Sequence, residues 1–310
     1  MRVYLTQELV NKIWKILSEE GKENYSLTIW SNYPDKLIRR SSLFFGIHQH
    51  ELQDSLILLV TGNQANLYSQ KQMCLPEDSF GLFARNCFVE DPFYSFSLES
   101  IQFNGVDTSE VKDMRWMFAN CDASELCLGK FDTSNVTDMC GMFWRCKAKC
   151  LDLSGFHTEK VTDMSHMFGI CSATSLDLSH FDTGKVIDMG GMFHDCKVAS
   201  LDLRGFDTGN VTNMASMFSS CKADIIGLDH FDTSKVTNMN RMFRSYCNPI
   251  ADLDLRSWDT SSVTTMVEMF HSCQIASLNL ENWNTSHVED MSFMFYECSV
   301  PKLDIDVFLL

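Results

Sequence analysis

Apolar side chains recur along most of this chain at a fixed interval. The pattern Met-x-x-Met-Phe occurs eight times between Met114 and Phe295, at steps of 25 residues with a single step of 27. A valine stands three residues before the first methionine of each copy, and a cysteine follows the phenylalanine by three residues in seven of the eight. Such self-similarity is typical of repeat proteins, whose units bury their apolar faces only by stacking on one another.

Within one repeat, the spacing favours a short strand and a short helix. The apolar residues of Val136–Cys146 fall at i, i+3, i+6, i+7 and i+10, which is one face of a helix. Thr133 or Ser134 stands where the helix N-cap would lie, and Leu151–Leu153 alternates as a strand does. The sequence therefore predicts an α/β solenoid over residues 87–310, a leucine-rich-repeat-like stack of short parallel strands and short helices with about eight to nine repeats.

Residues 1–86 do not share the repeat and are expected to form a separate element. One helix is predicted over about Thr6–Glu20, because its apolar residues share one face. Strands are predicted at Tyr25–Trp30 and Ser55–Val60, which are rich in apolar and β-branched residues. This small α+β element is interpreted as a cap over the first repeat, with an effector or docking domain as the alternative.

The repeat unit also resembles a known family. Residues 176–189 read LDLSHFDTGKVIDM. This unit resembles that of the BspA-type leucine-rich-repeat proteins, which are mostly bacterial surface proteins, and the likeness extends over about residues 87–308. The resemblance implies a leucine-rich-repeat-like solenoid with a role in binding or adhesion, and it implies no catalytic residues.

The composition is acidic, with a net charge of −16. Such a charge disfavours direct binding to nucleic acid and favours a basic protein partner. No stretch reaches the ~18 apolar residues of a membrane span, and the first residues lack the apolar core of a secretory signal. The sequence as written is therefore expected to be cytoplasmic, or cell-surface or secreted if an export segment has been removed.

An acidic column is predicted on the strand side of the repeats, because the residue between two inward-facing leucines points away from the core. Its members are Asp152, Asp177, Asp202, Asp254 and Asp304. Like charges stacked at roughly 5 Å repel one another unless something offsets them, and Arg204 and Arg256 are placed to do so. The column is either a solvated face or a docking face for a basic partner or divalent cations.

Large aromatic residues occupy repeat positions that are otherwise small or polar. They are Trp116, Trp144, Phe293 and Tyr296. Exposed aromatic groups on a repeat scaffold often mark contacts with a partner, although single ones also occur by chance. These four residues, together with the acidic column, form the candidate partner-binding set.

The remaining reactive residues predict no chemistry. One cysteine per repeat at a core position indicates buried, reduced thiols. His48, His50 and Glu51 offer too few ligands for a zinc site, and the histidines of the repeats are expected to be solvated. With no nucleophile–base pair, phosphate-binding loop or paired-carboxylate site, the sequence predicts a protein that is not an enzyme and holds no metal or cofactor.

Together these patterns predict a non-catalytic protein-binding repeat scaffold, adhesin-like or a more general interaction module. The alternative is a cytosolic acidic inhibitor or immunity protein that occupies a basic site on a partner enzyme. The apolar residues 307–310 would expose an apolar face at the last repeat, so weak self-association through this C-terminal end is also expected.

Overall fold

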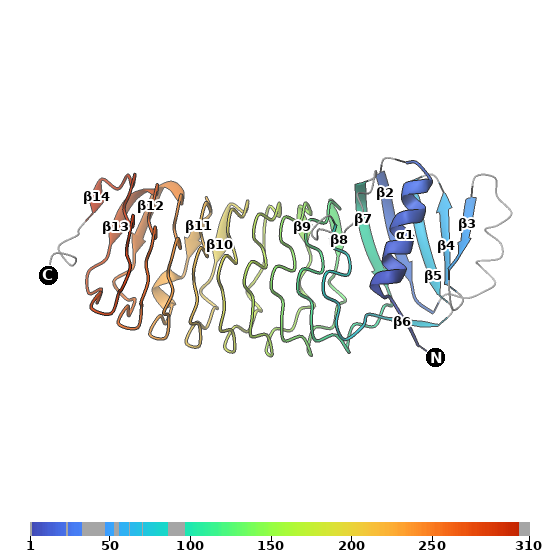
Figure 1. Ribbon diagram of the computed structural model, residues 1–310, viewed down its shortest axis with the longest axis horizontal. Coiled ribbons are helices and arrows are strands. Elements are labelled where there is room, and N and C mark those ends of the chain that lie inside the picture. The colour runs from blue at the N-terminus through green and yellow to red at the C-terminus, as the bar shows by residue number, and fades with distance from the viewer. Residues whose placement is uncertain are drawn as a thin grey trace.

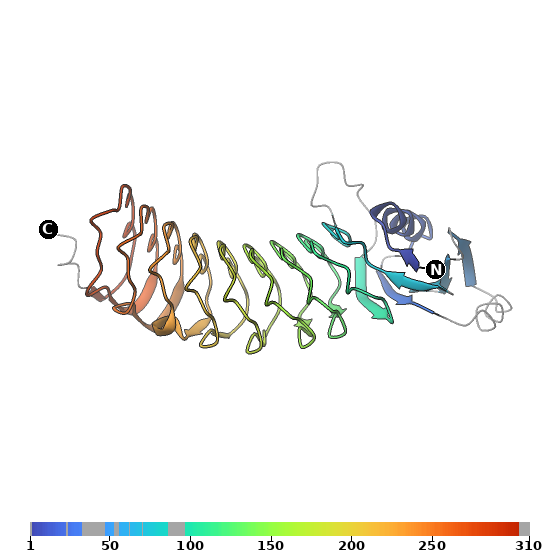
Figure 2. The ribbon, with the colours of Figure 1, turned by 90° about the horizontal axis from the view of Figure 1, so that it is seen from below.

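The chain forms an elongated stack of repeats with a compact α+β element at one end (Figure 1). The computed structural model describes residues 2–22, 24–32, 47–52, 56–61, 63–69, 71–85 and 97–303. The short strands of the repeats lie along one long side of the stack (Figure 2).

The N-terminal element pairs one helix with a sheet. The helix α1 spans Gln7–Glu19, and the side chain of its N-cap, Thr6, accepts a hydrogen bond from the Leu9 amide at 3.3 Å. Its apolar face, which includes Ile13 and Trp14, is buried against the sheet. The strands here are β1 (Arg2–Tyr4), β2 (Asn24–Trp30), β3 (Ile47–Glu51), β4 (Leu56–Thr61), β5 (Gln64–Ser69) and β6 (Gln72–Cys74). The predicted helix and both predicted strands coincide with α1, β2 and β4.

One sheet continues from this element into the first repeats. Its strand order is β3-β4-β5-β2-β7-β8-β9, where β7 is Ser97–Asn104, β8 is Glu125–Cys127 and β9 is Cys150–Leu151. Strand β7 pairs in parallel with β2 on one side and with β8 on the other. The first repeats therefore extend the N-terminal sheet.

Further along the stack the strands vary from two to eight residues and form separate sheets. Strand β10 (Ser200–Asp202) pairs in parallel with β11 (Asp224–Ile226). Strand β13 (Gln274–Asn279) lies between β12 (Cys247–Asp254) and β14 (Lys302–Leu303) in a second parallel sheet. A 3-10 turn, η1, spans Leu228–His230.

The predicted α/β solenoid is wrong, because the repeats contain no α-helix among the described residues. The only α-helix described is α1, and the segments expected to be helical form successive turns. In the segment Val136–Cys146, Gly141 and Arg145 have φ angles of 61° and 53°. A right-handed helix requires φ near −63°, so two left-handed residues four positions apart end any helix.

Hydrogen bonds within and between repeats replace the helical ladder. The amides of Met142 and Cys146 bond to the carbonyls three residues earlier in the same repeat, at 3.2 and 3.0 Å. The amides of Met139 and Phe143 instead donate to Asp163 and Met167 of the next repeat, at 3.0 and 2.9 Å. Backbone groups that a helix would satisfy internally therefore join each repeat to its neighbour.

The predicted core columns are buried even though they do not lie on helices. The repeated valines, both methionines and the phenylalanine have exposed fractions of 0 % in most repeats. The phenylalanines form one column along the axis, with successive ring centroids 5.5 to 6.0 Å apart from Phe83 to Phe295. This column supplies the continuous apolar core of the stack.

Candidate functional site

The structure places four members of the acidic column at exposed positions beside the strands. Each closes a turn, because one carboxylate oxygen accepts the amide of the residue two positions on. The acceptors are Asp152, Asp177, Asp202 and Asp254, at donor–acceptor distances of 3.1, 3.1, 3.2 and 3.3 Å. Asp304 lies outside the described residues. The recurrence of aspartate in this column therefore has a local cause, which is turn formation.

The column is not uniformly charged. Arg204 forms an ion pair with Asp202 at 2.5 Å, and Arg256 forms one with Asp254 at 2.7 Å. Hydrogen bonding from Arg204 lowers the pKa of Asp202 to about 2. Asp152 instead accepts a hydrogen bond from the uncharged Ser154 hydroxyl at 2.6 Å, which lowers its pKa without cancelling its charge. The equivalent contact from the Ser179 hydroxyl, at 2.7 Å, lowers the pKa of Asp177. Uncompensated negative charge is therefore concentrated at Asp152 and Asp177.

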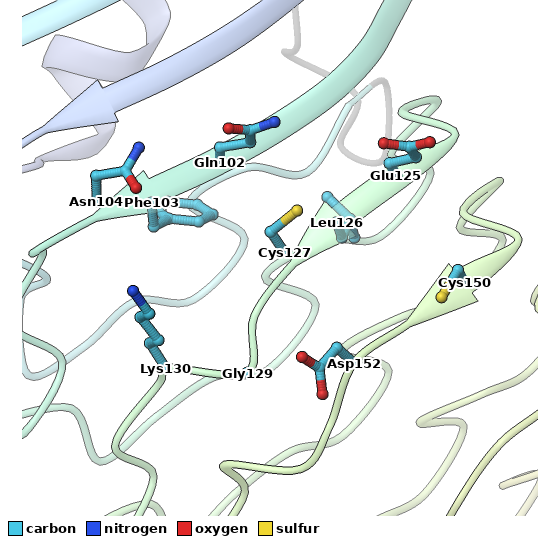
Figure 3. Close-up of a pocket in the computed structure, with 10 residues that line it drawn as sticks. All are labelled: Gln102, Phe103, Asn104, Glu125, Leu126, Cys127, Gly129, Lys130, Cys150 and Asp152. Atoms are coloured by element: carbon cyan, nitrogen blue, oxygen red, sulfur yellow. The ribbon is translucent and has the colours of Figure 1, made fainter.

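Three open depressions lie along this column. The largest, about 530 Å³, is at the junction of β7, β8 and β9, and Asp152 is on its rim (Figure 3). The Lys130 side chain also lines this depression and points away from Asp152, and Glu125 lies at the other end. Asp177 and Asp202 line the second depression, and Asp254 lines the third. The first depression also contains apolar and thiol groups, namely Phe103, Leu126, Cys127 and Cys150.

The predicted aromatic residues gather into two clusters on the turns. The Trp116 and Trp144 rings are 6.2 Å apart, and the Phe293 and Tyr296 rings are 5.8 Å apart. Both tryptophans are half-buried, whereas Phe293 and Tyr296 are 62 % and 52 % exposed. The second pair sits in the last described repeat, where the His271 ring is 5.2 Å from Tyr296.

Two histidines expected to be solvated instead pack against the tryptophans. The rings of His166 and His194 lie 5.1 and 6.0 Å from Trp144. Both imidazoles are half-buried, and neither Nδ1 atom has a hydrogen-bond partner. Burial lowers the pKa of both histidines. We call Trp116, Trp144, His166 and His194 the aromatic ridge.

Glycines in the next repeat make room for three of these rings. A Cβ atom on Gly141 would lie 2.6 Å from the Trp116 ring, and one on Gly169 would lie 2.3 Å from Trp144. The same substitution at Gly191 would place a carbon 2.3 Å from Nδ1 of His166. Glycines at alternating turn positions are therefore the sequence signal that could have identified the ridge and its histidines.

Among the described residues, no group of three or more His, Cys, Asp or Glu side chains is arranged to hold a metal ion. The side chains of His48, His50 and Glu51 lie outside the described part of the chain. All described cysteines are free thiols, and none of the described helices is long and apolar enough to cross a membrane.

Comparison with known proteins adds one finding. Three overlapping segments, residues 88–202, 144–226 and 223–308, match a family described as "Mycoplasma protein of unknown function, DUF285". Together the three segments extend over more than half of the chain. No curated protein and no solved structure matches it.

Proposed function

Because this chain belongs to the DUF285 family of repeat proteins, we propose that it is a non-catalytic scaffold that binds a basic protein partner. The binding face would be the acidic column, centred on Asp152 and Asp177. The observation that carries the proposal is a pair of exposed carboxylates one repeat apart, Asp152 and Asp177, whose hydrogen-bond donors are serines and not basic side chains. An adhesin-like role, suggested by the resemblance to BspA-type proteins, is the form of this function that we favour.

The chemistry of the first depression supports a basic partner. A lysine or arginine side chain combines an apolar stem with a cationic end. The stem would lie against Phe103 and Leu126, which line the depression, and the charged end would reach Asp152 on its rim. Asp177 then offers a second uncompensated carboxylate one repeat further along. Charge complementarity of this kind speeds association and selects the partner.

The same charges also fit the alternative function, an acidic inhibitor that occupies the basic site of an enzyme. The inhibitor function is favoured by the unneutralised carboxylates at two adjacent repeats, because such closely spaced charges match the small area of a basic active site. The two functions differ in outcome. An inhibited partner loses catalytic activity on binding, whereas a partner held by a scaffold does not.

Paired charge substitutions test the binding face. We expect peptides selected on the intact chain from a random display library to be rich in lysine and arginine. The double variant Asp152→Asn/Asp177→Asn should weaken their binding by about tenfold, or ~1.4 kcal/mol, measured by titration calorimetry. Asparagine retains the oxygen that closes each turn, and the chain itself uses Asn279 in this column, accepting the Glu281 amide at 3.0 Å.

The matched control makes the same charge change elsewhere on each repeat. Asp182 and Asp207 are exposed and also accept a backbone amide two residues on, each at 3.0 Å. The variant Asp182→Asn/Asp207→Asn should bind the selected peptides as the unmodified chain does. Equal weakening in both double variants would show a general charge effect and reject the acidic column as the binding face.

A further inference from the structure

The cysteines of the repeats form a column of free thiols whose members differ in exposure. Two pairs from neighbouring repeats, Cys121 with Cys146 and Cys273 with Cys298, have the same backbone arrangement: the amide of the residue after the second cysteine donates to the carbonyl of the first, at 2.8 Å in both pairs. The first pair is fully buried, with exposed fractions of 0 % for both residues. In the second pair Cys273 is buried but Cys298 is only half-buried. The two pairs therefore share a geometry and differ in access to solvent.

The backbone holds Cys273 and Cys298 at equivalent positions. Each amide closes the same turn, bonding at 3.1 Å to the carbonyl three residues earlier. The next residues, Gln274 and Ser299, form a parallel bridge, and the Ser299 amide donates to the Cys273 carbonyl at 2.8 Å. Neighbouring strands lie ~4.8 Å apart, and disulfides span Cα separations of about 4.4–6.8 Å. The two residues can therefore be bridged with little backbone movement.

The two thiols differ in exposure and in how readily they ionise. The neighbouring Cys273 thiol lowers the pKa of Cys298, although burial opposes this effect. The same contact and burial raise the pKa of Cys273. The thiolate is the nucleophile in thiol–disulfide exchange. Cys298 is thus both the more accessible thiol and the more readily ionised one.

We propose that Cys273 and Cys298 are a modification site that forms a reversible disulfide with a low-molecular-weight disulfide, such as oxidised glutathione, as the oxidant. The Cys298 thiolate attacks one sulfur of the oxidant, forms a mixed disulfide and releases the other half as a thiolate. Cys273 then gives up its proton, attacks the Cys298 sulfur and displaces the second half. Two protein thiols are oxidised, and one small disulfide is reduced to two thiols.

The bond would tie together the two repeats that carry the second aromatic cluster. Cys273 lies two residues after His271, and Cys298 lies two residues after Tyr296, and these rings are in contact. Oxidation would therefore fix the relative position of the turns that present His271, Phe293 and Tyr296. Reduction by an excess of small thiol would release it.

Mass spectrometry of the intact folded chain tests the proposal directly. After incubation with oxidised glutathione, free thiols are alkylated under denaturing conditions and the chain is digested with trypsin. Residues 257–302 form one tryptic peptide, because no lysine or arginine occurs before Lys302, and its only cysteines are Cys273 and Cys298. We expect this peptide to lose two hydrogen atoms and both alkyl labels. Cys121 and Cys146, the buried matched pair, should remain fully alkylated.

Single substitutions test the order of the steps. In Cys273→Ser, Cys298 should accumulate the mixed disulfide with glutathione, because no second thiol displaces it. In Cys298→Ser, Cys273 should stay reduced in the folded chain. The proposal is overturned if the unmodified chain keeps both labels on residues 257–302, or if Cys121 and Cys146 oxidise at the same rate as Cys273 and Cys298.

Discussion

Single buried side chains determine how one repeat is attached to the next. The threonine expected near the N-cap of each predicted helix is buried in seven repeats, and its hydroxyl donates to a backbone carbonyl of the following repeat. In five of them the hydroxyl also accepts an amide of that repeat. Thr158 is an example: its hydroxyl donates to the Asp182 carbonyl at 2.9 Å and accepts the Asp182 amide at 2.8 Å. A threonine at this position indicated a hydrogen bond to the backbone. The partner of Thr158 lies 24 residues away, however, and could not be identified from local spacing.

Replacing this threonine should weaken the stack. Thr158→Val keeps the shape but removes the buried hydroxyl that bonds to the amide and carbonyl of Asp182, so we expect a loss of about 1–3 kcal/mol in the free energy of unfolding. Urea denaturation would measure it. Thr162→Val is the control, because the exposed Thr162 hydroxyl makes one bond, to the Thr137 carbonyl at 3.2 Å. Equal losses in the two variants would contradict a special role for the buried threonine.

A second residue adopts a conformation that its side chain disfavours. Ile170 has φ of 55°, in the left-handed region where β-branched residues are strained, while the first repeat has Asn120 at the same position with φ of 51°. Ile170→Asn should therefore raise the free energy of unfolding by about 1 kcal/mol, measured by urea denaturation. Ile187→Asn, at an exposed position with ordinary backbone, should bring no gain. A loss of stability in Ile170→Asn would show that the packing of the isoleucine outweighs the strain.

At the scale of elements, the sequence predicted which residues are buried but not the structure that buries them. Residues at 0, +3, +4 and +7 share one face of a helix, and they also share one side of two successive turns. Met139, Met142, Phe143 and Cys146 have this spacing and are all buried. The deciding signal is the conformation of Gly141 and Arg145, and arginine gives no indication of a left-handed backbone.

The candidate site divides in the same way. Alternation along the strand correctly placed Asp152 and Asp177 at exposed positions, since it depends on period alone. The aromatic ridge could be predicted only by knowing that Trp144 lies over Gly169 of the next repeat. That contact is set by the turns and not by a helix. Phe83, within the predicted N-terminal element, stacks on Phe118 at 5.5 Å and is the first ring of the core column.

The aromatic ridge should make stability depend on pH. Burial lowers the pKa of His166 and His194, although Asp163 and Asp188 oppose this at His166, and Asp195 does so at His194. The unfolded chain therefore takes up protons first, below about pH 6.5. We expect the free energy of unfolding to fall as the pH drops from 7 towards 5, and to fall less steeply in His166→Asn/His194→Asn. An unchanged slope in this double variant would assign the effect to other groups.

At the scale of the whole molecule, the stack has one continuous core. The phenylalanine column begins at Phe83, beside the N-terminal element, and ends at Phe295 in the last described repeat. In such arrays each unit is stabilised mainly by contacts with its two neighbours. Damage at the centre is therefore expected to uncouple the two halves.

Phe193 tests this expectation, because its fully buried ring lies 5.9 Å from Phe168 and 6.0 Å from Phe218. Phe193→Ala should cost about 3–5 kcal/mol and broaden the urea transition as the halves separate. Ile187→Ala, in the same repeat but 49 % exposed, is the control and should leave the transition unchanged. A loss below about 0.5 kcal/mol, within the range of ordinary surface substitutions, would contradict the central position of this ring.

The uniform hydrogen bonding between repeats has a consequence for how such a protein changes over generations. Every unit meets its neighbours through the same donors and acceptors, so a duplicated or deleted unit finds a matching partner on both sides. The 27-residue step demonstrates this tolerance: β12 shifts register between Asn248 and Asp252, yet Asn238 and Thr265 still form their bridge. Recombination between similar gene segments can thus lengthen or shorten the molecule in steps of ~4.8 Å. The length of the stack then changes while the packing of its core is kept.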